Sequence, residues 1–207
     1  MAKILLSLDV ENFRSLRNVS LPLGRLNVLV GPNGAGKTNL LEVFRFLADV
    51  IRTDLEPALE LRGGFDQLVF RGGYRPSTVD LRKYVPSVRI KLTATWTTYS
   101  SPRAPDPEPP ALTCVEEIDH GLHPQALELL VERLREASQR TQFLIATHSP
   151  EVADRLKPEE LVVCERRDDG SSVIPAVSTE RVRQIVAESE GLPLGDLWFS
   201  GALGGDL

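Results

Sequence analysis

Apolar and polar residues follow two different periods in the first quarter of this chain. Residues 3–10 and 19–23 alternate apolar with polar positions, which is the period of a half-buried strand. A third apolar run, residues 25–30, leads into a glycine-rich stretch. From residue 39 to 50 the apolar positions recur every three or four residues, as they do in a helix. This part of the chain therefore predicts an antiparallel β ribbon, a further strand and a helix.

Strand and helix patterns alternate in the second half. The predicted elements are a strand at 88–97, a strand at 111–115, a helix from Pro124, a strand at 142–146, a hairpin of 161–164 with 173–177 joined through 167–170, and a helix from Ser178 or Thr179 to Glu188. Such alternation implies parallel strands, and the carboxyl ends of parallel strands carry working residues on one edge of the sheet.

Proline and glycine interrupt these patterns at three places. Pro57 and the glycine pairs at 63–64 and 72–73 end the periodicity of the first helix. Residues 100–110 hold five of the fifteen prolines and predict a linker. We expect one domain over residues 1–207, with a β-rich segment at 61–99 and the linker at 100–110.

The glycine-rich stretch, residues 31–38, has two glycines five positions apart followed by Lys and Thr. When a glycine loop lies between a strand and a helix, its backbone N–H groups and the positive end of the helix dipole point at the same place. Such a place can bind a polyphosphate. The Lys37 ammonium suits the β- and γ-phosphates, and the Thr38 hydroxyl suits Mg²⁺. The residues predicted to bind the nucleotide here are Asn33, Gly34, Ala35, Gly36, Lys37, Thr38 and Asn39. The fold class predicted is α/β: a P-loop NTPase with a parallel or mixed core sheet flanked by helices and an N-terminal antiparallel β ribbon.

Acidic residues and a histidine follow two of the predicted parallel strands. Glu116 and Glu117 end the strand after the proline linker, and His148 ends the next strand. In phosphoryl transfer, one such acid holds the Mg²⁺ shell while a neighbouring carboxylate orients the attacking water. We therefore predict Glu116 as a metal ligand with Thr38, and Glu117 and His148 as catalytic residues.

Composition and charge narrow the function classes. The 207 residues are 42% hydrophobic and 26% charged, and no apolar run has the length of a membrane span or signal peptide, so we expect a cytoplasmic protein without a membrane partner. Cys114 and Cys164 lie in apolar runs and predict buried free thiols. The net charge of −5 argues against general nucleic-acid affinity, yet residues 62–91 carry seven Lys or Arg against two acids. That segment predicts either a solvated face or a nucleic-acid surface.

Together these motifs resemble the RecF/SMC-like branch of the ABC-type ATPases, especially bacterial predicted ATPases of the OLD type. The matching segments are 12–16, the P-loop with Asn39, 116–124, 147–150 and 194–201. The resemblance implies ATP and Mg²⁺ as ligands. It also implies roles for individual residues: Glu116 as the Walker B acid, Glu117 as the catalytic base, His148 as the switch histidine, Arg14 as a nucleotide contact, and Asp119 and His120 in a loop facing a second subunit.

The chain departs from that family between the two nucleotide motifs. Only 79 positions separate Lys37 from Glu116, and they contain no Ser-x-Gly signature, which in the family caps the γ-phosphate of the opposite subunit from a long helical insert. Gln67 is the one glutamine between the motifs and a weak candidate for the Q-loop. We expect a homodimer through the ATP face to be weakened.

Three functions remain open at this point. The first is a Mg²⁺-dependent ATPase domain serving DNA repair, chromosome handling or phage defence, as the resemblance implies. The second is an ATP-binding module with little turnover that signals its nucleotide state to DNA or a partner protein. The third is a metal site, for which the candidate residues are Cys114, Asp119, His120 and His123. Their spacing does not supply a suitable fourth ligand.

Overall fold

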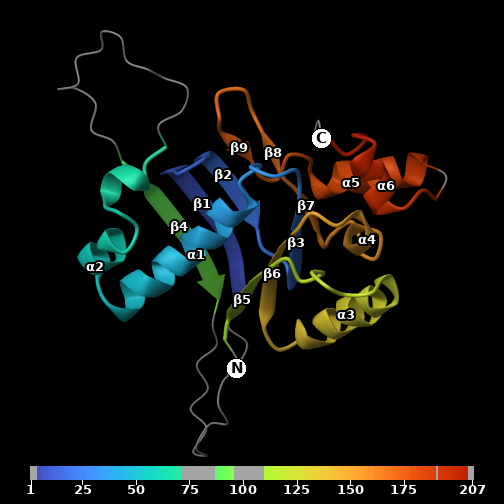
Figure 1. Cartoon of the computed structure of the whole chain (residues 1–207), viewed down its shortest axis with the longest axis horizontal. Helices are drawn as coiled ribbons and strands as arrows, with labels where there is room; N and C mark the ends of the chain where they lie inside the picture. The colour runs from blue at the N-terminus through green and yellow to red at the C-terminus, as the bar shows by residue number, and fades with distance from the viewer. Residues whose placement is uncertain (1–3, 71–86, 96–109, 190, 205–207) are drawn as a thin grey trace, which may run out of the picture.

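Two larger β-sheets lie side by side in the computed structural model, which describes residues 4–70, 87–95, 110–189 and 191–204 (Figure 1). The first sheet is an antiparallel ribbon in the order β2-β1-β4, formed by Leu16–Pro22, Ile4–Phe13 and Arg89–Thr95. β1 alternates inward apolar residues such as Leu8 and Val10 with more accessible ones. The predicted N-terminal ribbon is thus confirmed, and β4 joins it.

The second sheet is parallel and carries the strand ends of interest. Its order is β5-β6-β3-β7, formed by Leu112–Glu116, Gln142–Thr147, Leu26–Val30 and Leu161–Val163. All five residues of β3 are buried, as expected for a strand covered on both faces, whereas all five of the edge strand β5 are half-buried. The order brings the ends of β3, β5 and β6 to one edge, as the alternation of strands and helices predicted.

Helices cover both faces of the parallel sheet. On one face, α1 (Lys37–Arg52) packs with the ribbon in one apolar cluster that includes Leu40, Leu41 and Leu29. On the other face, Val28 and Val30 lie in a second cluster with residues of α3 (Pro124–Ala137), α4 (Pro150–Ala153), α5 (Thr179–Glu188) and α6 (Leu194–Phe199). The predicted α/β class, a core sheet flanked by helices, is therefore confirmed.

A buried amide joins the two sheets. Gln142, 2% exposed at the start of β6, accepts a hydrogen bond from the Leu5 N–H at 2.6 Å and donates from Nε2 to the carbonyls of Leu5 and Gly24. Its side chain pairs with β1 as a neighbouring strand would. The ribbon is therefore attached to the parallel sheet at the start of β1.

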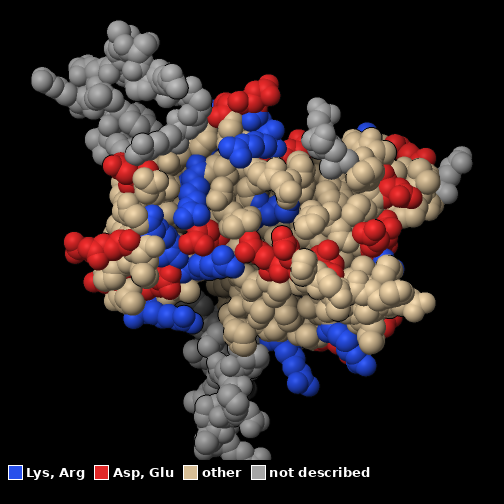
Figure 2. All heavy atoms as spheres, in the orientation of Figure 1, with Lys and Arg blue, Asp and Glu red and all other residues tan. Residues whose placement is uncertain are grey.

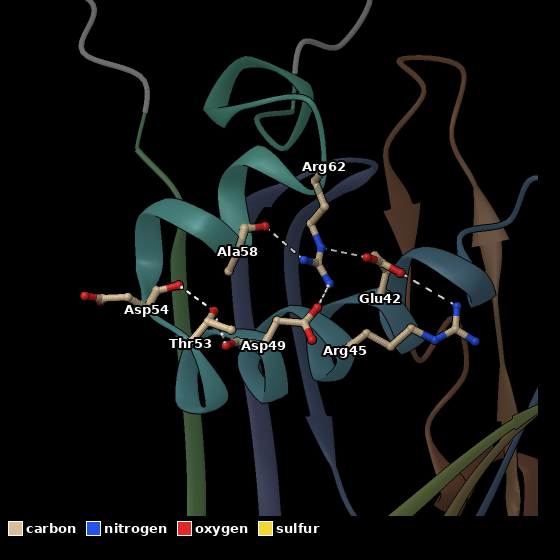
Figure 3. Close-up of polar contacts among 7 residues, drawn as sticks. All are labelled: Glu42, Arg45, Asp49, Thr53, Asp54, Ala58 and Arg62. Carbon is tan, nitrogen blue, oxygen red and sulfur yellow. Dashed lines mark hydrogen bonds and ion pairs between the residues drawn. The ribbon is translucent and has the colours of Figure 1, made fainter.

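Arg62 holds α2 (Leu55–Glu60) against α1 (Figure 3). Its guanidinium lies between Glu42 at 2.7 Å and Asp49 at 2.6 Å, and its carbon Cζ is 5.3 Å from the centre of the Phe46 ring. The side chain is 7% exposed. This arginine of the basic segment 62–91 is therefore part of the interior rather than a surface for nucleic acid.

Of the other basic residues of that segment, Arg89 and the exposed Lys91 lie in β4, and the rest fall outside the described residues. Arg89 forms an exposed ion pair with Glu11 at 2.8 Å. Arg71, Arg75, Arg82 and Lys83 lie outside the described residues, as does nearly all of the linker at 100–110. On the face shown in Figure 2, acidic and basic side chains are intermixed.

The C-terminal hairpin differs from its prediction. Residues 161–163 form β7 in the parallel sheet, and the hairpin is made by β8 (Glu165–Arg166) and β9 (Ser172–Val173). The apolar run at 161–164 is explained by burial beside β3 rather than by hairpin pairing. Ser178 caps α5, which confirms the predicted last helix, although α6 follows it.

Pro57 also had an unexpected position. It lies in the first turn of α2, where a helix needs no N–H donor, so it does not exclude a helix there. A 3₁₀ turn, Phe65–Gln67, follows, and its Gln67 is exposed.

Candidate nucleotide site

The P-loop lies between β3 and α1, and two of its glycines are required by close packing. A Cβ on Gly31 would lie 2.3 Å from the Cys164 carbonyl oxygen. Gly36 precedes α1 with φ of 102°, and a Cβ there would lie 2.1 Å from Ser172 Oγ. The backbone therefore passes where side chains do not fit, and the first N–H groups of α1 point at the loop.

Lys37 folds back onto this loop. Its Nζ donates to the carbonyl oxygens of Gly31 at 2.5 Å and Pro32 at 3.0 Å. Burial lowers the pKa of the Lys37 ammonium, while the neighbouring Cys164 and Glu117 groups oppose that shift. The ammonium is therefore held at the loop by two neutral carbonyl oxygens. Phosphate oxygens are better acceptors because they carry more charge, so they would replace the carbonyls.

A small polar network fastens the loop to the rest of the fold. Ser15, in the turn between β1 and β2, accepts a hydrogen bond from Asn39 Nδ2 at 2.7 Å, and its hydroxyl lies 2.7 Å from that of Ser172. The Ser172 N–H donates to the Ser15 carbonyl at 2.8 Å. The ribbon, α1 and the β8–β9 hairpin therefore meet beside the P-loop.

The two acids stand at the end of β5 in different surroundings. Glu116 Oε2 is 3.2 Å from Arg45 Nη2 of α1. Glu117 is exposed and has φ of 52°, a left-handed conformation that costs a non-glycine residue about 1–2 kcal/mol. Its N–H donates to the Ala146 carbonyl at 2.8 Å. Such backbone strain is frequent at functional sites, where the surrounding structure maintains it.

His148 follows β6 and is exposed, while its neighbours have structural roles. Thr147 Oγ1 donates to Asp119 at 2.7 Å, and Ser149 caps α4 through the Val152 N–H. These bonds fix the backbone on both sides of His148. The backbone of His148 is therefore fixed at the strand end, and its side chain lines the pocket described next.

A pocket of about 480 Å³ unites the predicted residues. It is lined by Asn33, Gly34, Gly36, Lys37, Thr38, Asn39, Glu116, Glu117, Ala146, Thr147, His148 and Arg166. Of the predicted site residues, Ala35 is buried in the core beneath the loop and Arg14 is not among the lining residues. Arg14 belongs to the turn that Ser15 anchors, and its N–H donates to the Leu68 carbonyl.

Three lining residues, Ala146, Thr147 and Arg166, were not among the predicted site residues, and of these only Arg166 is charged. It lies in β8, and its Nη1 donates to the Gly34 carbonyl oxygen at 3.0 Å. Its only sequence signal is a basic pair, Arg166 and Arg167, after an apolar strand. That signal does not distinguish a pocket residue from a surface one.

The residues present fit a nucleotide with a divalent cation. The loop offers N–H donors, a helix N-terminus and an ammonium for the phosphates. Thr38 and Glu116, which line the same pocket, offer the oxygen donors that Mg²⁺ prefers.

The alternative metal site receives no support from its side chains. His123 Nδ1 accepts the Gln125 N–H at 3.3 Å and caps α3, and Asp119 accepts from Thr147. Within the described ranges, no three His, Cys, Asp or Glu residues are grouped to hold a metal ion. Cys114 and Cys164 are free thiols, and burial raises their pKa values to about 11 and about 12.

Two stretches of the chain, residues 26–101 and 99–154, match the family described as "AAA domain, putative AbiEii toxin, Type IV TA system". Among curated proteins, 81 residues are 38% identical to the OLD nuclease of Thermus scotoductus, and 59 residues are 51% identical to the DNA replication and repair protein RecF of Anaeromyxobacter sp. (strain K). These matches cover 32% and 28% of this chain but only 15% and 14% of the relatives.

Solved structures share the fold at low sequence identity. The SMC head bound to the C-winged helix domain of ScpA aligns with a TM-score of 0.57 and 12% identity over 87% of this chain and 99% of the other. The SMC head domain from Thermotoga maritima aligns with a TM-score of 0.53 and 15% identity over 84% and 99%. Along the described part of the chain, none of the helices combines the length and apolar character that a membrane crossing requires.

Proposed function

On the premise that this chain belongs to that AAA domain family and is a RecF/SMC/OLD-like ABC-type ATPase, we propose that it binds ATP with Mg²⁺ in the described pocket and hydrolyses it. One observation carries the proposal. Lys37 and Thr38 of the P-loop line the same pocket as Glu116, Glu117 and His148, which come from two other strand ends. Phosphate-binding and water-activating groups therefore face one space.

Each residue has a role that its chemistry suits. The P-loop N–H groups and Lys37 bind the phosphates, and Asn39 holds Ser15 beside the loop. Thr38 and Glu116 would hold Mg²⁺, which when bound neutralises phosphate charge. Glu117 accepts a proton from the attacking water, and His148 orients that water or the γ-phosphate by a hydrogen bond. Arg14 is proposed as a further nucleotide contact from the ribbon turn.

A DNA-related process is part of the proposal. The relatives carry the names of a nuclease and of a DNA replication and repair protein, and these names support DNA or a DNA-bound protein as a partner. We also propose a homodimer through the ATP face, with Asp119 and His120 near the partner. The lack of a Ser-x-Gly signature between Lys37 and Glu116 weakens that dimer, because closure then adds less charge stabilisation.

The same missing signature favours a second function, an ATP-binding module with little turnover. Glu117 and His148 favour the first. Steady-state hydrolysis with and without DNA separates the two, since a module of the second kind retains ATP affinity but turns over far below the 1–100 s⁻¹ or so of complete phosphoryl-transfer sites.

Two measurements test the proposal: ATP affinity by calorimetry and steady-state ATP hydrolysis. Both are made on the parent, Lys37→Ala and Glu117→Gln. We expect Lys37→Ala to lose most ATP affinity and Glu117→Gln to keep it while hydrolysis falls by about 10²-fold or more. Equal ATP affinity in the parent and Lys37→Ala would contradict binding at the P-loop. Equal turnover in the parent and Glu117→Gln would contradict the role of Glu117.

A further inference from the structure

The β8–β9 hairpin places a second cation at the P-loop, beside Lys37. Arg166 Nη1 lies 3.0 Å from the Gly34 carbonyl oxygen, although 132 positions separate the two residues. Lys37 and Arg166 are the Lys and Arg residues of the pocket lining, which also includes the acids Glu116 and Glu117. Two distant segments of the chain thus each contribute a cation to the pocket.

Three contacts fix the hairpin that carries Arg166. Ser172 is 3% exposed and bonds to Ser15 through both its hydroxyl and its N–H. Asp169, in the hairpin turn, pairs with Arg17 of β2 at 3.2 Å. Before β8, the Cys164 N–H donates to the Val30 carbonyl at 2.7 Å. The backbone of Arg166 is therefore held in place, while its side chain is exposed.

We propose that Arg166 is a nucleotide-binding residue whose guanidinium contacts the phosphate chain. This inference rests on the proposed function, because it assigns a further ligand to the same nucleotide. The Gly34 carbonyl is a neutral acceptor, and a phosphate oxygen carries more charge and forms a stronger bond with a guanidinium. A guanidinium has five N–H donors in a planar fork, so one can stay on Gly34 while others reach the phosphates.

The position of Arg166 also bears on the missing signature. In phosphoryl transfer, an arginine supplied by the same chain stabilises charge that builds up on the transferring group. Arg166 would provide such charge without a second subunit. It would then support nucleotide binding by one copy of the chain.

The test compares Arg166→Gln and Arg166→Lys with the parent, using calorimetric titration with ATP and Mg²⁺. Glutamine retains an N–H donor for the Gly34 carbonyl but carries no charge, whereas lysine retains the charge without the fork. We expect Arg166→Gln to weaken ATP binding by about 10- to 100-fold, the range of a lost charge-assisted hydrogen bond, and Arg166→Lys to lie between it and the parent. Arg167→Gln, exposed and adjacent but not in the pocket lining, is the matched control and should bind as the parent does.

A structural role predicts the opposite pattern. If Arg166 only supports the loop through Gly34, then Arg166→Gln binds ATP like the parent, and that result overturns the inference. A drop in the melting temperature of the ligand-free Arg166→Gln protein that accounts for its weaker binding would overturn it as well. Lys37→Ala, measured in parallel, separates the two proposals. If the parent binds ATP, Lys37→Ala does not and Arg166→Gln matches the parent, the proposed function stands and only this inference fails.

Discussion

The pocket has two sides that the fold supports unequally. The phosphate side, residues 31–39, follows the fully buried strand β3 and is tied to the ribbon and the β8–β9 hairpin through Ser15 and Ser172. The carboxylate side, formed by Glu116, Glu117 and His148, follows the half-buried edge strand β5 and its neighbour β6. Glu117 and His148 are exposed.

In the proposed function, this difference separates nucleotide binding from hydrolysis. A loop fixed before the ligand arrives needs little reorganisation to hold phosphates, which favours affinity. Exposed catalytic groups work in water-like surroundings, where charges interact weakly, until something covers them. The comparison predicts that changes on the phosphate side affect folding and binding, and that changes on the carboxylate side affect turnover.

The largest expected effect is on the phosphate side, with Gly36→Ala. Its Cβ would lie 2.1 Å from Ser172 Oγ and 2.8 Å from Ser172 Cβ, and φ is 102°. Strain and overpacking together should lower the free energy of unfolding by about 2–4 kcal/mol, measured by urea denaturation. Gly121→Ala is the matched control, because φ there is 76° with nothing within 4 Å, and it should cost about 1 kcal/mol. Equal losses in the two variants would contradict close packing at Gly36.

A smaller effect is expected for Ser172→Ala. The change removes the buried hydroxyl that lies 2.7 Å from Ser15 Oγ, while Asn39 still donates to Ser15. We expect a loss of about 1 kcal/mol in unfolding free energy. The control is Ser20→Ala, since Ser20 makes an exposed hydrogen bond to Asp9 and should change stability by less than about 0.5 kcal/mol. Comparable values would mean that the hairpin contact does not fasten the loop.

On the carboxylate side, Glu117→Gly should stabilise the protein while reducing turnover. The left-handed φ of 52° costs glutamate about 1–2 kcal/mol, and glycine loses about 0.5–1 kcal/mol of that gain to backbone entropy. The expected net gain is about 0.5 kcal/mol in chemical denaturation. Glu117→Gln keeps the strain and should leave stability unchanged. A destabilised Glu117→Gly protein would show that the glutamate side chain stabilises the fold.

The smallest effect on stability is expected for Arg45→Gln. The Arg45–Glu116 pair is at the surface, with side chains 49% and 30% exposed, so its loss should cost less than about 0.5 kcal/mol. Without the arginine, Glu116 has one cation fewer competing with Mg²⁺, and less Mg²⁺ should be needed for half-maximal ATP binding. A loss above about 1 kcal/mol in thermal denaturation would contradict this view of the pair.

The sequence pattern predicted those elements whose conformation is determined by residues close together in the chain. The P-loop, its flanking strand and helix, and the helix starting at Pro124 are set by residues close together in sequence, and the structure confirms them. The parallel sheet follows from the strand and helix alternation. The acids and His148 were placed together because parallel strands end at one edge.

The missed features depend on distant contacts. Residues 161–163 pair with β3 rather than with the hairpin, because only the folded sheet shows where a partner strand is free. Arg166 meets Gly34 across 132 positions, and no local pattern records that contact. Pro57 was interpreted as the end of the helical pattern, because the spacing of apolar residues did not show that a new helix begins at Leu55.

The amide of Gln142 has a mechanical consequence. The ribbon is attached at the start of β1 by Gln142 and at its far turn by Ser15, with the ten residues of β1 between them, about 30 Å of strand. β1 is thus held near both ends, by a buried glutamine at its start and by the hydrogen bonds of Ser15 beside the P-loop at its far turn. A displacement of about 1 Å at Ser15 would correspond to a tilt of only about 2° over that length. The ribbon and the P-loop are therefore connected directly through Ser15, while Gln142 holds the other end of the strand.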